Sequence, residues 1–186
     1  MDAEDAIRSR RTVKAFDRTA VERETLEELL ELARWAPNHN LTNPWRFRVV
    51  GPRALERLKQ AAAELGAATA PAGADPQECG RVAAAKLDRA PTLVVCSVRL
   101  TGDEVQDEED MHAAGVAAYI VLLAAHARGL ASYWRTPGVL RTDAGRAAVE
   151  LPAGERFVGL LYLGRARQDT DPPGREPVEH YATFLD

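Results

Sequence analysis

The sequence predicts a single globular domain in which helices alternate with strands. Its 186 residues include 46% hydrophobic and 28% charged side chains, a composition that suits one domain with a sizeable core. Apolar residues recur at helical spacing in some segments and form short runs typical of strands in others. No internal repeat or break in composition divides the chain. We therefore expect residues 1–186 to form one domain.

The first half of the chain alternates helical and extended patterns. In TLEELLELARWA, leucines recur at helical spacing between glutamates, and Pro37 then ends the pattern. The stretch PAGADPQECG has the composition of a loop, which we interpret as a mobile flap. The elements that we expect here are a short helix at 2–9, an extended segment at 10–16, a helix at 25–36, a strand at 44–51, a helix at 54–67 and the loop at 71–80.

The second half is organised around a long apolar segment. Residues 103–110 hold six carboxylates in eight positions, and the apolar stretch 112–129 follows them. We interpret the acids as an exposed loop and helix N-terminus, and the apolar stretch as a buried helix with a glycine cap. Metal binding by the acids, or by His112 and His126, is the alternative. The other elements expected here are a strand buried on both faces at 92–99, a strand at 131–135, a helix at 142–150 and a strand at 156–164.

The tail at 169–186 is rich in proline, yet it ends with Tyr181, Phe184 and Leu185. A disordered tail has little use for large apolar side chains. We expect this tail to lie extended on a surface, that of a second subunit.

Charge and cysteine content exclude several classes of partner. The formal net charge of -4 argues against nucleic acid and against anionic membranes, because such partners are met by basic domains. Cys79 and Cys96 are too few for a disulfide framework and lack the spacing of a zinc site. The acidic start does not resemble a signal peptide, and we expect no membrane-spanning segment. We therefore expect a cytoplasmic protein with free thiols.

The common catalytic motifs are absent. The chain contains no GxGxxG, GxxxxGK[ST], HExxH or GxSxG. Dinucleotide-binding folds of the Rossmann type, P-loop NTPases, zinc peptidases and serine hydrolases therefore lose their simplest support.

A local basic row stands out in RSRRTVKAFD. If the segment is extended, Arg10, Thr12 and Lys14 share one face and spread over about 13 Å. Arginine suits a phosphate, threonine a hydroxyl, and lysine a ring that gains negative charge. Flavin mononucleotide (FMN) has these three parts in that order. The alternatives are an exposed cationic strand that pairs with the acidic segment 103–110, and a nucleic-acid module at Arg8–Arg18, which the acidic remainder disfavours.

Three motifs together resemble one known family. RSRRTVKAF, WAPNHNLTNPWRF and GLASYWRT followed by VGLLYLG are similar, in order and spacing, to the short members of the nitroreductase family of FMN-dependent oxidoreductases. The resemblance implies an α+β fold with a mainly antiparallel sheet wrapped by helices. It also implies an intertwined homodimer with FMN in each of two interface clefts. The tail at 169–186 would then be an arm over the partner subunit.

The resemblance also assigns site residues near the N-terminus. Arg10, Arg11 and Thr12 match the stretch that holds the FMN phosphate and ribityl chain. Lys14 matches a lysine at the pyrimidine edge of the flavin, where it would stabilise the reduced ring.

Two further segments carry implied cofactor contacts. His39 and, less directly, Trp35 and Asn43 match the turn that reaches the flavin of the other subunit. Here the sequence departs from the family, since Asn38 and His39 replace serines and Asn43 replaces a glutamine. Trp45 is expected in the core. The third motif adds an arginine aimed at the phosphate, with the expected contacts being Trp134, Arg135 and Thr136.

The implied activity is ping-pong electron transfer. NADH or NADPH would reduce the flavin at N5, and a small electron acceptor such as a nitroaromatic or quinone would reoxidise it. No residue is identified that must act as a general acid. The alternatives are a flavin-binding or flavin-storage protein without turnover, and an FMN-dependent reductase or dehydrogenase of a biosynthetic pathway with a non-nitro substrate.

Overall fold

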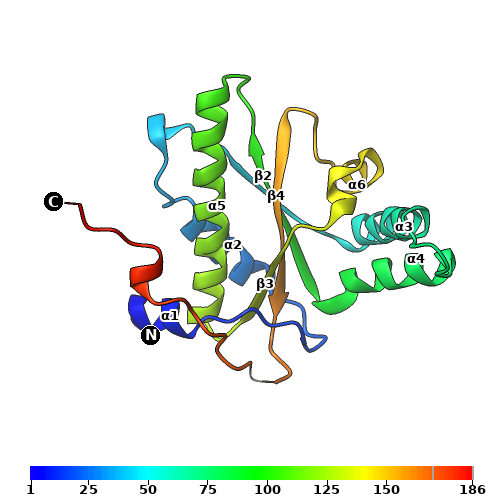
Figure 1. Cartoon of the computed structure of the whole chain (residues 1–186), viewed down its shortest axis with the longest axis horizontal. Coiled ribbons are helices and arrows are strands. Elements are labelled where there is room, and N and C mark those ends of the chain that lie inside the picture. The colour runs from blue at the N-terminus through cyan, green and yellow to red at the C-terminus, as the bar shows by residue number, and fades with distance from the viewer. Residues whose placement is uncertain (169, 186) are drawn as a thin grey trace.

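A four-stranded antiparallel sheet forms the centre of the molecule, and helices cover both of its faces (Figure 1). The computed structural model describes residues 1–168 and 170–185. The strand order is β1-β2-β4-β3, which confirms the expected α+β class with a mainly antiparallel sheet. The strands are β1 (Trp45–Val49), β2 (Thr92–Arg99), β3 (Ala131–Arg135) and β4 (Glu155–Gly164).

Strand β2 lies inside the sheet and is covered on both faces. Its first seven residues are buried, as predicted from a stretch that is apolar almost throughout. It pairs with β1 on one side and with β4 on the other, and the register shifts between Cys96 and Ser97. Strand β3 pairs with β4 and leaves its other edge to the N-terminal segment, through a parallel bridge between Thr12 and Ser132.

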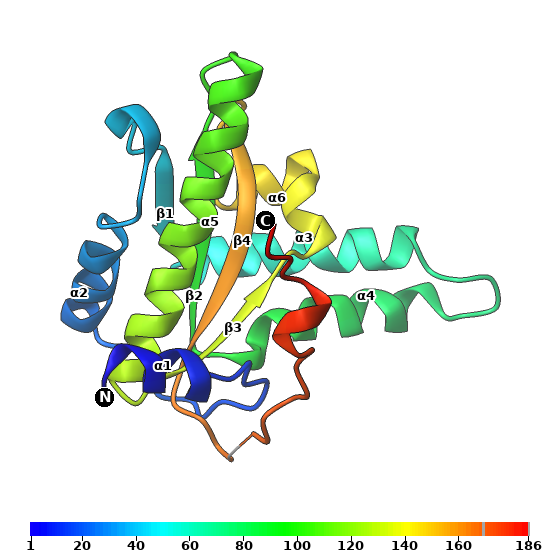
Figure 2. The ribbon, with the colours of Figure 1, turned by 60° about the vertical axis from the view of Figure 1, so that its left-hand side comes forward.

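The helices divide between the two faces of the sheet. On one face, α2 and α5 pack over a cluster that includes Val94, Leu161 and Leu163, and on the other face α3 packs over Val95, Leu160 and Tyr162 together with α6. Figure 2 shows α1 beside the C-terminal end of α5. The helices are α1 (Ala3–Ser9), α2 (Arg23–Ala33), α3 (Pro52–Ala68), α4 (Pro76–Ala85), α5 (Glu104–Ala127) and α6 (Asp143–Ala148).

Helix α5 includes both the acidic and the apolar segments. It begins at Glu104, and the Asp103 side chain caps it by accepting from the backbone N–H of Gln106. The expected helix N-terminus is therefore confirmed, with residues 104–110 in the first turns of the helix, but the expected exposure is wrong for Asp107 and Asp110, which are buried. Gly129 follows the helix with φ 73°, the left-handed conformation expected of a glycine cap. By length and composition alone α5 could cross a membrane, and half of its most apolar window is buried inside the structure.

The prediction of a mobile loop over residues 71–80 is wrong for its second half. Helix α4 begins at Pro76, and the Asp75 side chain caps it by accepting from the backbone N–H of Gln77. Gly80 packs against α3 so closely that a Cβ there would lie 2.6 Å from the carbonyl oxygen of Ala63. Pro76 thus occupies the first turn of α4, and Gly80 allows α4 to pack closely against α3.

The tail from residue 170 to 185 is exposed along nearly all of its length. It contains one short 3₁₀ turn at Val178–His180, and the Phe184 side chain is 93% exposed. Residues 169 and 186, the first and last of the expected arm, lie outside the described residues.

Candidate functional site

The basic segment between α1 and α2 is extended, as its pattern predicts. Val13 donates its backbone N–H to the carbonyl oxygen of Ser132 at 3.0 Å, and Phe16 bridges to Ala166. The Val13 and Phe16 side chains are buried, whereas Thr12 and Lys14 are exposed. The buried side chains hold the segment against the sheet, so the polar ones face outward along one row.

This row lines a small cavity. Arg10, Arg11, Thr12 and Lys14 border a space of about 230 Å³, together with residues of the tail that include Arg175. The four cations that line it are Arg10, Arg11, Lys14 and Arg175. Among the described residues, none of them takes part in an ion pair. Asp171 also lines the cavity, so the cations outnumber the acids there, and this excess of positive charge makes the cavity a candidate site for an anion.

The Arg10 side chain packs against α5, and its Nε has no polar partner in the described part of the chain. Its guanidinium lies over the ring of Tyr119 in α5, 5.9 Å from the ring centroid. Its Nε is buried without a hydrogen-bond partner among the described residues. Since a buried donor is costly to leave unsatisfied, this atom indicates a place where an acceptor from a ligand fits.

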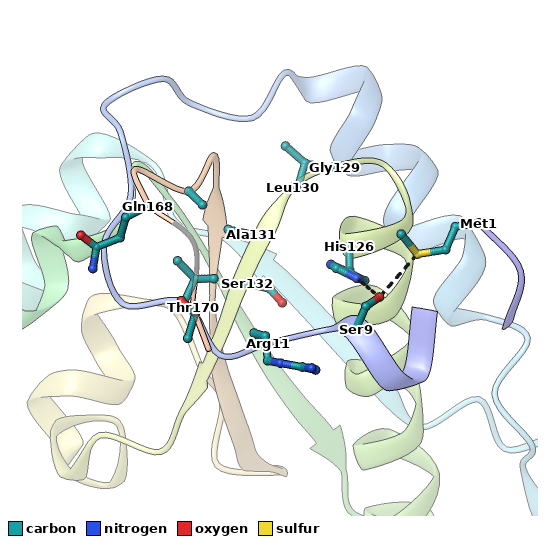
Figure 3. A pocket seen from close by; sticks show the side chains of 12 residues that line it. Met1, Ser9, Arg11, His126, Gly129, Leu130, Ala131, Ser132, Gln168 and Thr170 are labelled. Atoms are coloured by element: carbon teal, nitrogen blue, oxygen red, sulfur yellow. Dashed lines mark hydrogen bonds between the residues drawn. The ribbon is translucent and has the colours of Figure 1, made fainter. Parts of the chain in front are cut away.

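A second cavity of about 390 Å³ adjoins the first and shares Arg11 with it (Figure 3). Ser9 and His126 face each other across one side of it, with Ser9 Oγ 2.7 Å from His126 Nε2. Burial, followed by the charges of Arg10 and Arg11, lowers the pKa of His126. Ser132 lies on β3 at this cavity, and its buried hydroxyl has no partner among the described residues. Both unsatisfied polar atoms, Arg10 Nε and Ser132 Oγ, therefore lie close to the bridge between Thr12 and Ser132, where the N-terminal segment pairs with β3.

The basic row does not pair with the acidic segment 103–110. Arg10 lies over Tyr119, and the charges of Arg10 and Arg11 lower the pKa of His126; both of these residues are in the second half of α5, whereas the acids form its first turns. No ion pair among the described residues joins the two segments. This separation disfavours the reading of the row as a cationic strand neutralised by those acids. In the described part of the chain, no group of three or more His, Cys, Asp or Glu side chains could hold a metal ion.

The segment 38–43 docks on the first turns of α5. His39 Nδ1 lies 2.7 Å from a carboxylate oxygen of Glu109. Asn43 is exposed with φ 46°, and its side chain donates to the carbonyl oxygen of Leu41. Trp35, just after α2, is 75% exposed. Glu109 precedes Tyr119 by ten residues, about 15 Å along the helix axis, so one chain does not bring His39 to Arg10.

The third predicted group lies on and just after β3. Trp134 packs into the α5 side of the sheet, and Thr136 is exposed. Arg135 donates to the hydroxyl of Tyr162 at 3.1 Å and lines a different cavity, of about 190 Å³, beside α3 and α4. Burial raises the pKa of Tyr162, and the charge of Arg135 opposes that shift. Within one chain Arg135 is therefore not directed at the cavity that Arg10 lines. Trp45 is partly buried against the core, as expected.

Three residues that contact the predicted site residues carry no signal in the sequence. Tyr119 and Ser132 reach the basic row only through the packing of α5 and the pairing of β3. Glu109 is one of six acids in its segment, and only the fold selects it as the partner of His39.

The family comparison matches most of the chain. The model of the nitroreductase family matches residues 7–165. Curated relatives include "Putative NAD(P)H nitroreductase YdjA" of Escherichia coli K12, which is 29% identical over 165 residues, with 88% of each chain covered. The Bacillus subtilis protein YfhC, named in the same way, is 26% identical over 183 residues, which cover 97% of this chain and 93% of YfhC.

Solved structures share the fold over the full chain. A nitroreductase-like family protein from Bacillus cereus superposes with a TM-score of 0.85 at 24% identity, covering 100% of this chain and 96% of the other. The FMN and NADPH-dependent nitroreductase NfnB from Sphigopyxis sp. strain HMH gives a TM-score of 0.82 at 19% identity, with 100% of each chain covered. At these identities the likeness establishes the fold.

Proposed function

Because this chain belongs to the nitroreductase family, we propose that it is an FMN-dependent oxidoreductase that uses NADH or NADPH to reduce a small acceptor. The observation that carries this proposal is the row of Arg10, Arg11, Thr12 and Lys14 along one cavity. Whole ligand sites are typically about 300–1,000 Å³. The cavity of about 230 Å³ is therefore sized for the phosphate and ribityl part of FMN and not for all of it.

The residues present fit this cofactor. The unsatisfied Nε of Arg10 and the guanidinium of Arg11 would donate to the phosphate, because forked guanidinium donors match phosphate oxygens. The exposed hydroxyl of Thr12 would bond to the ribityl chain. We propose Ser132 as an added donor, since its buried hydroxyl has no partner among the described residues and it pairs with Thr12.

Lys14 would act on the redox chemistry through its charge. When bound, FMN supplies the two-electron transfer between the nicotinamide and the acceptor. Lys14 lies two positions beyond Thr12 on the exposed face, so its ammonium would hold positive charge at the ring edge. A fixed charge there stabilises the more negative, reduced ring more than the oxidised one.

We propose that the site is completed by a second copy of the chain. Helix α5 is apolar on all sides of its second half, which is typical of a helix with partners all round. The large apolar side chains that one copy leaves exposed include Trp35, Leu41, Val105, Val116, Tyr181 and Phe184. A homodimer would cover these residues and bring His39, Trp35 and Asn43 of one subunit to the basic row of the other.

The predicted cofactor contacts at the end of β3 are also part of this proposal. Trp134 and Thr136 flank Arg135 at the end of β3, and in the dimer we assign all three to the cofactor cleft. Arg135 would have to exchange its bond to Tyr162 for the phosphate. The whole chain would form a single FMN-binding domain, with the tail as the arm over the partner. We further propose a cytoplasmic location, in which Cys79 and Cys96 stay unpaired.

Nitroaromatics and quinones are the proposed acceptors. Several relatives carry nitroreductase names, among them the two described above. A second candidate is an FMN-dependent reductase with a non-nitro substrate, because the site residues proposed here bind the cofactor and do not select an acceptor. A flavin-storage protein without turnover would use the same cradle.

Spectroscopy of the purified protein tests the proposal. The protein should bind FMN, appear yellow, and lose its colour when NADH or NADPH is added without oxygen. Addition of a quinone or a nitroaromatic should restore the colour through repeated cycles. A preparation that takes up no added FMN would refute the cofactor assignment, and one that binds FMN but is never reduced by either nicotinamide would support storage.

A further inference from the structure

We propose that His39 is the proton donor to the acceptor, and that Glu109 positions it by fixing its tautomer. This inference rests on the proposed function, in which the segment 38–43 of one subunit faces the flavin bound by the other. It assigns a general acid to the reaction, with the donor atom at Nε2 of His39.

The geometry leaves one imidazole nitrogen fixed and the other free. His39 Nδ1 lies 2.7 Å from Glu109 Oε2, so its N–H donates to the carboxylate. A carboxylate on one nitrogen sets which of the two nitrogens carries the proton in the neutral ring. His39 Nε2 has no hydrogen-bond partner among the described residues, and the side chain is 66% exposed. That nitrogen is therefore free to reach a ligand from the solvent side.

The backbone that carries His39 is strained. Asn40, Leu41 and Asn43 have φ values of 56°, 50° and 46°, in the left-handed region. Such a conformation costs about 1–2 kcal/mol for an ordinary residue such as Leu41, and less for asparagine. Strain of this kind persists where the surroundings over-determine the conformation, and it gathers at functional sites.

Side chains of the segment and of α5 hold this conformation. Asn38 accepts from the backbone N–H of Asn43 at 2.7 Å and donates to the Thr42 hydroxyl at 2.9 Å. Thr42 donates in turn to Asp110, a carboxylate that is only 1% exposed. Asn40 donates to Gln106 at 3.1 Å. The segment is thus preorganised on α5 before any partner or ligand arrives.

A second histidine–carboxylate pair shows what an ordinary surface contact looks like. His180 Nδ1 lies 2.7 Å from Glu176, four residues away in the exposed tail. Exposed pairs of this sort contribute about 0–1 kcal/mol. The pair of His39 and Glu109 joins segments 70 residues apart and sits on a strained, side-chain-locked backbone. That difference is why we assign it a role beyond surface charge.

The proton step balances with the proposed reductant. Reduction of a quinone to a hydroquinone needs two electrons and two protons. FMN held by the basic row and reduced by NADH or NADPH would supply the two electrons together with one proton. The Nε2–H bond of protonated His39 breaks, its electron pair stays on nitrogen, and a new O–H bond forms on the acceptor. Solvent returns the proton to the imidazole between turnovers.

Separate half-reactions test the proposal in the FMN-loaded enzyme. His39→Ala should leave the bleaching of the flavin by NADPH within about twofold, and should slow reoxidation by a quinone by about 10²–10⁴-fold, the usual contribution of a general acid. Added imidazole should restore part of the reoxidation rate. The matched control is His112→Ala. This exposed histidine lies on α5 about one turn beyond Glu109, and its replacement should change neither half-reaction.

The role of Glu109 has a readout that does not depend on turnover. Nitrogen NMR of the FMN-free protein should show the Nδ1–H tautomer for neutral His39. In Glu109→Gln the amide can donate as well as accept, so the tautomer should become mixed. The same variant should slow reoxidation by at least tenfold while the FMN affinity stays unchanged.

The outcomes separate this inference from the proposed function. Reoxidation at the wild-type rate in His39→Ala, or an unchanged tautomer in Glu109→Gln, overturns the inference and leaves the flavin function intact. A wild-type protein that binds no FMN, or that NADPH and NADH fail to bleach, overturns the proposed function itself. Equal loss of both half-reactions in His39→Ala would mean that His39 is needed for cofactor placement, which also contradicts the proton-donor role.

Discussion

Replacing Arg10 with methionine separates cofactor binding from folding. Methionine keeps much of the aliphatic contact with Tyr119 but removes the buried, unpartnered Nε–H and the charge. Relief of the unsatisfied donor should stabilise the FMN-free protein by about 1–3 kcal/mol. Loss of the cation–π contact should cost about 0.5–1 kcal/mol. The FMN-free variant should therefore be at least as stable as the wild type.

The FMN-bound protein should respond in the opposite direction. Loss of a charge-assisted hydrogen bond to the phosphate costs about 1.5–3 kcal/mol, which corresponds to a Kd for FMN about 10- to 150-fold higher. Urea unfolding of the stripped protein measures the first effect, and quenching of FMN fluorescence measures the second.

Arg8→Met is the matched control for Arg10→Met. It removes the same charge from an exposed side chain whose one ion pair in the described part of the chain, with Glu4, lies within α1 at 3.5 Å. Its FMN affinity should equal that of the wild type. If Arg10→Met destabilises the stripped protein by more than about 1 kcal/mol and binds FMN normally, then Arg10 serves the fold and the reasoning fails.

Three further changes test other parts of the site. Lys14→Ala should retain FMN but lower its reduction potential, measured by anaerobic dye equilibration; an unchanged potential would remove Lys14 from the redox role. Because burial and nearby arginines lower the pKa of His126 below 6.5, folding stability should fall as pH drops below 6.5, and His126→Gln should flatten that profile in urea titrations. Gly159→Ala places a Cβ 2.1 Å from Nε1 of Trp134 and should destabilise the fold by about 1–3 kcal/mol, whereas wild-type stability would show that the indole can move aside.

The sequence predicts the basic row because the signal is local. Alternation alone places Thr12 and Lys14 on the exposed face and buries Val13 between them, and the structure has this arrangement. The partners of the row are not local. Tyr119 is more than 100 positions away from Arg10, and only the packing of α1 beside α5 brings them together.

The main error in the predicted secondary structure is the loop at 71–80, where α4 begins at Pro76. Proline and glycine dominate PAGADPQECG, so the stretch resembles a loop. Yet Asp75 before Pro76 is a helix-start signal, since aspartate caps and proline suits the first turn. Composition outweighed position in that prediction.

The segment 38–43 shows where sequence reasoning stops. The resemblance marks His39, but nothing in the sequence gives its bond to Glu109 or the left-handed backbone at Asn40 and Leu41. Asn tolerates that region better than other residues do, whereas Leu41 adopts it only because its neighbours are held by α5. Such long-range constraint is a property of the folded chain.

The most direct test of the central claim is NADPH-driven quinone turnover in mixed dimers. One subunit would carry Arg10→Met with Arg11→Met, which disables the basic row, and the other His39→Ala with Asn43→Ala, which disables the segment 38–43. If each site takes its row from one subunit and its segment from the other, the mixed dimer regains one intact site, while both parent dimers have none. NADPH-driven quinone reduction by the purified mixed dimer is the result that we predict. A mixed dimer as inactive as its parents would contradict a site shared between two subunits.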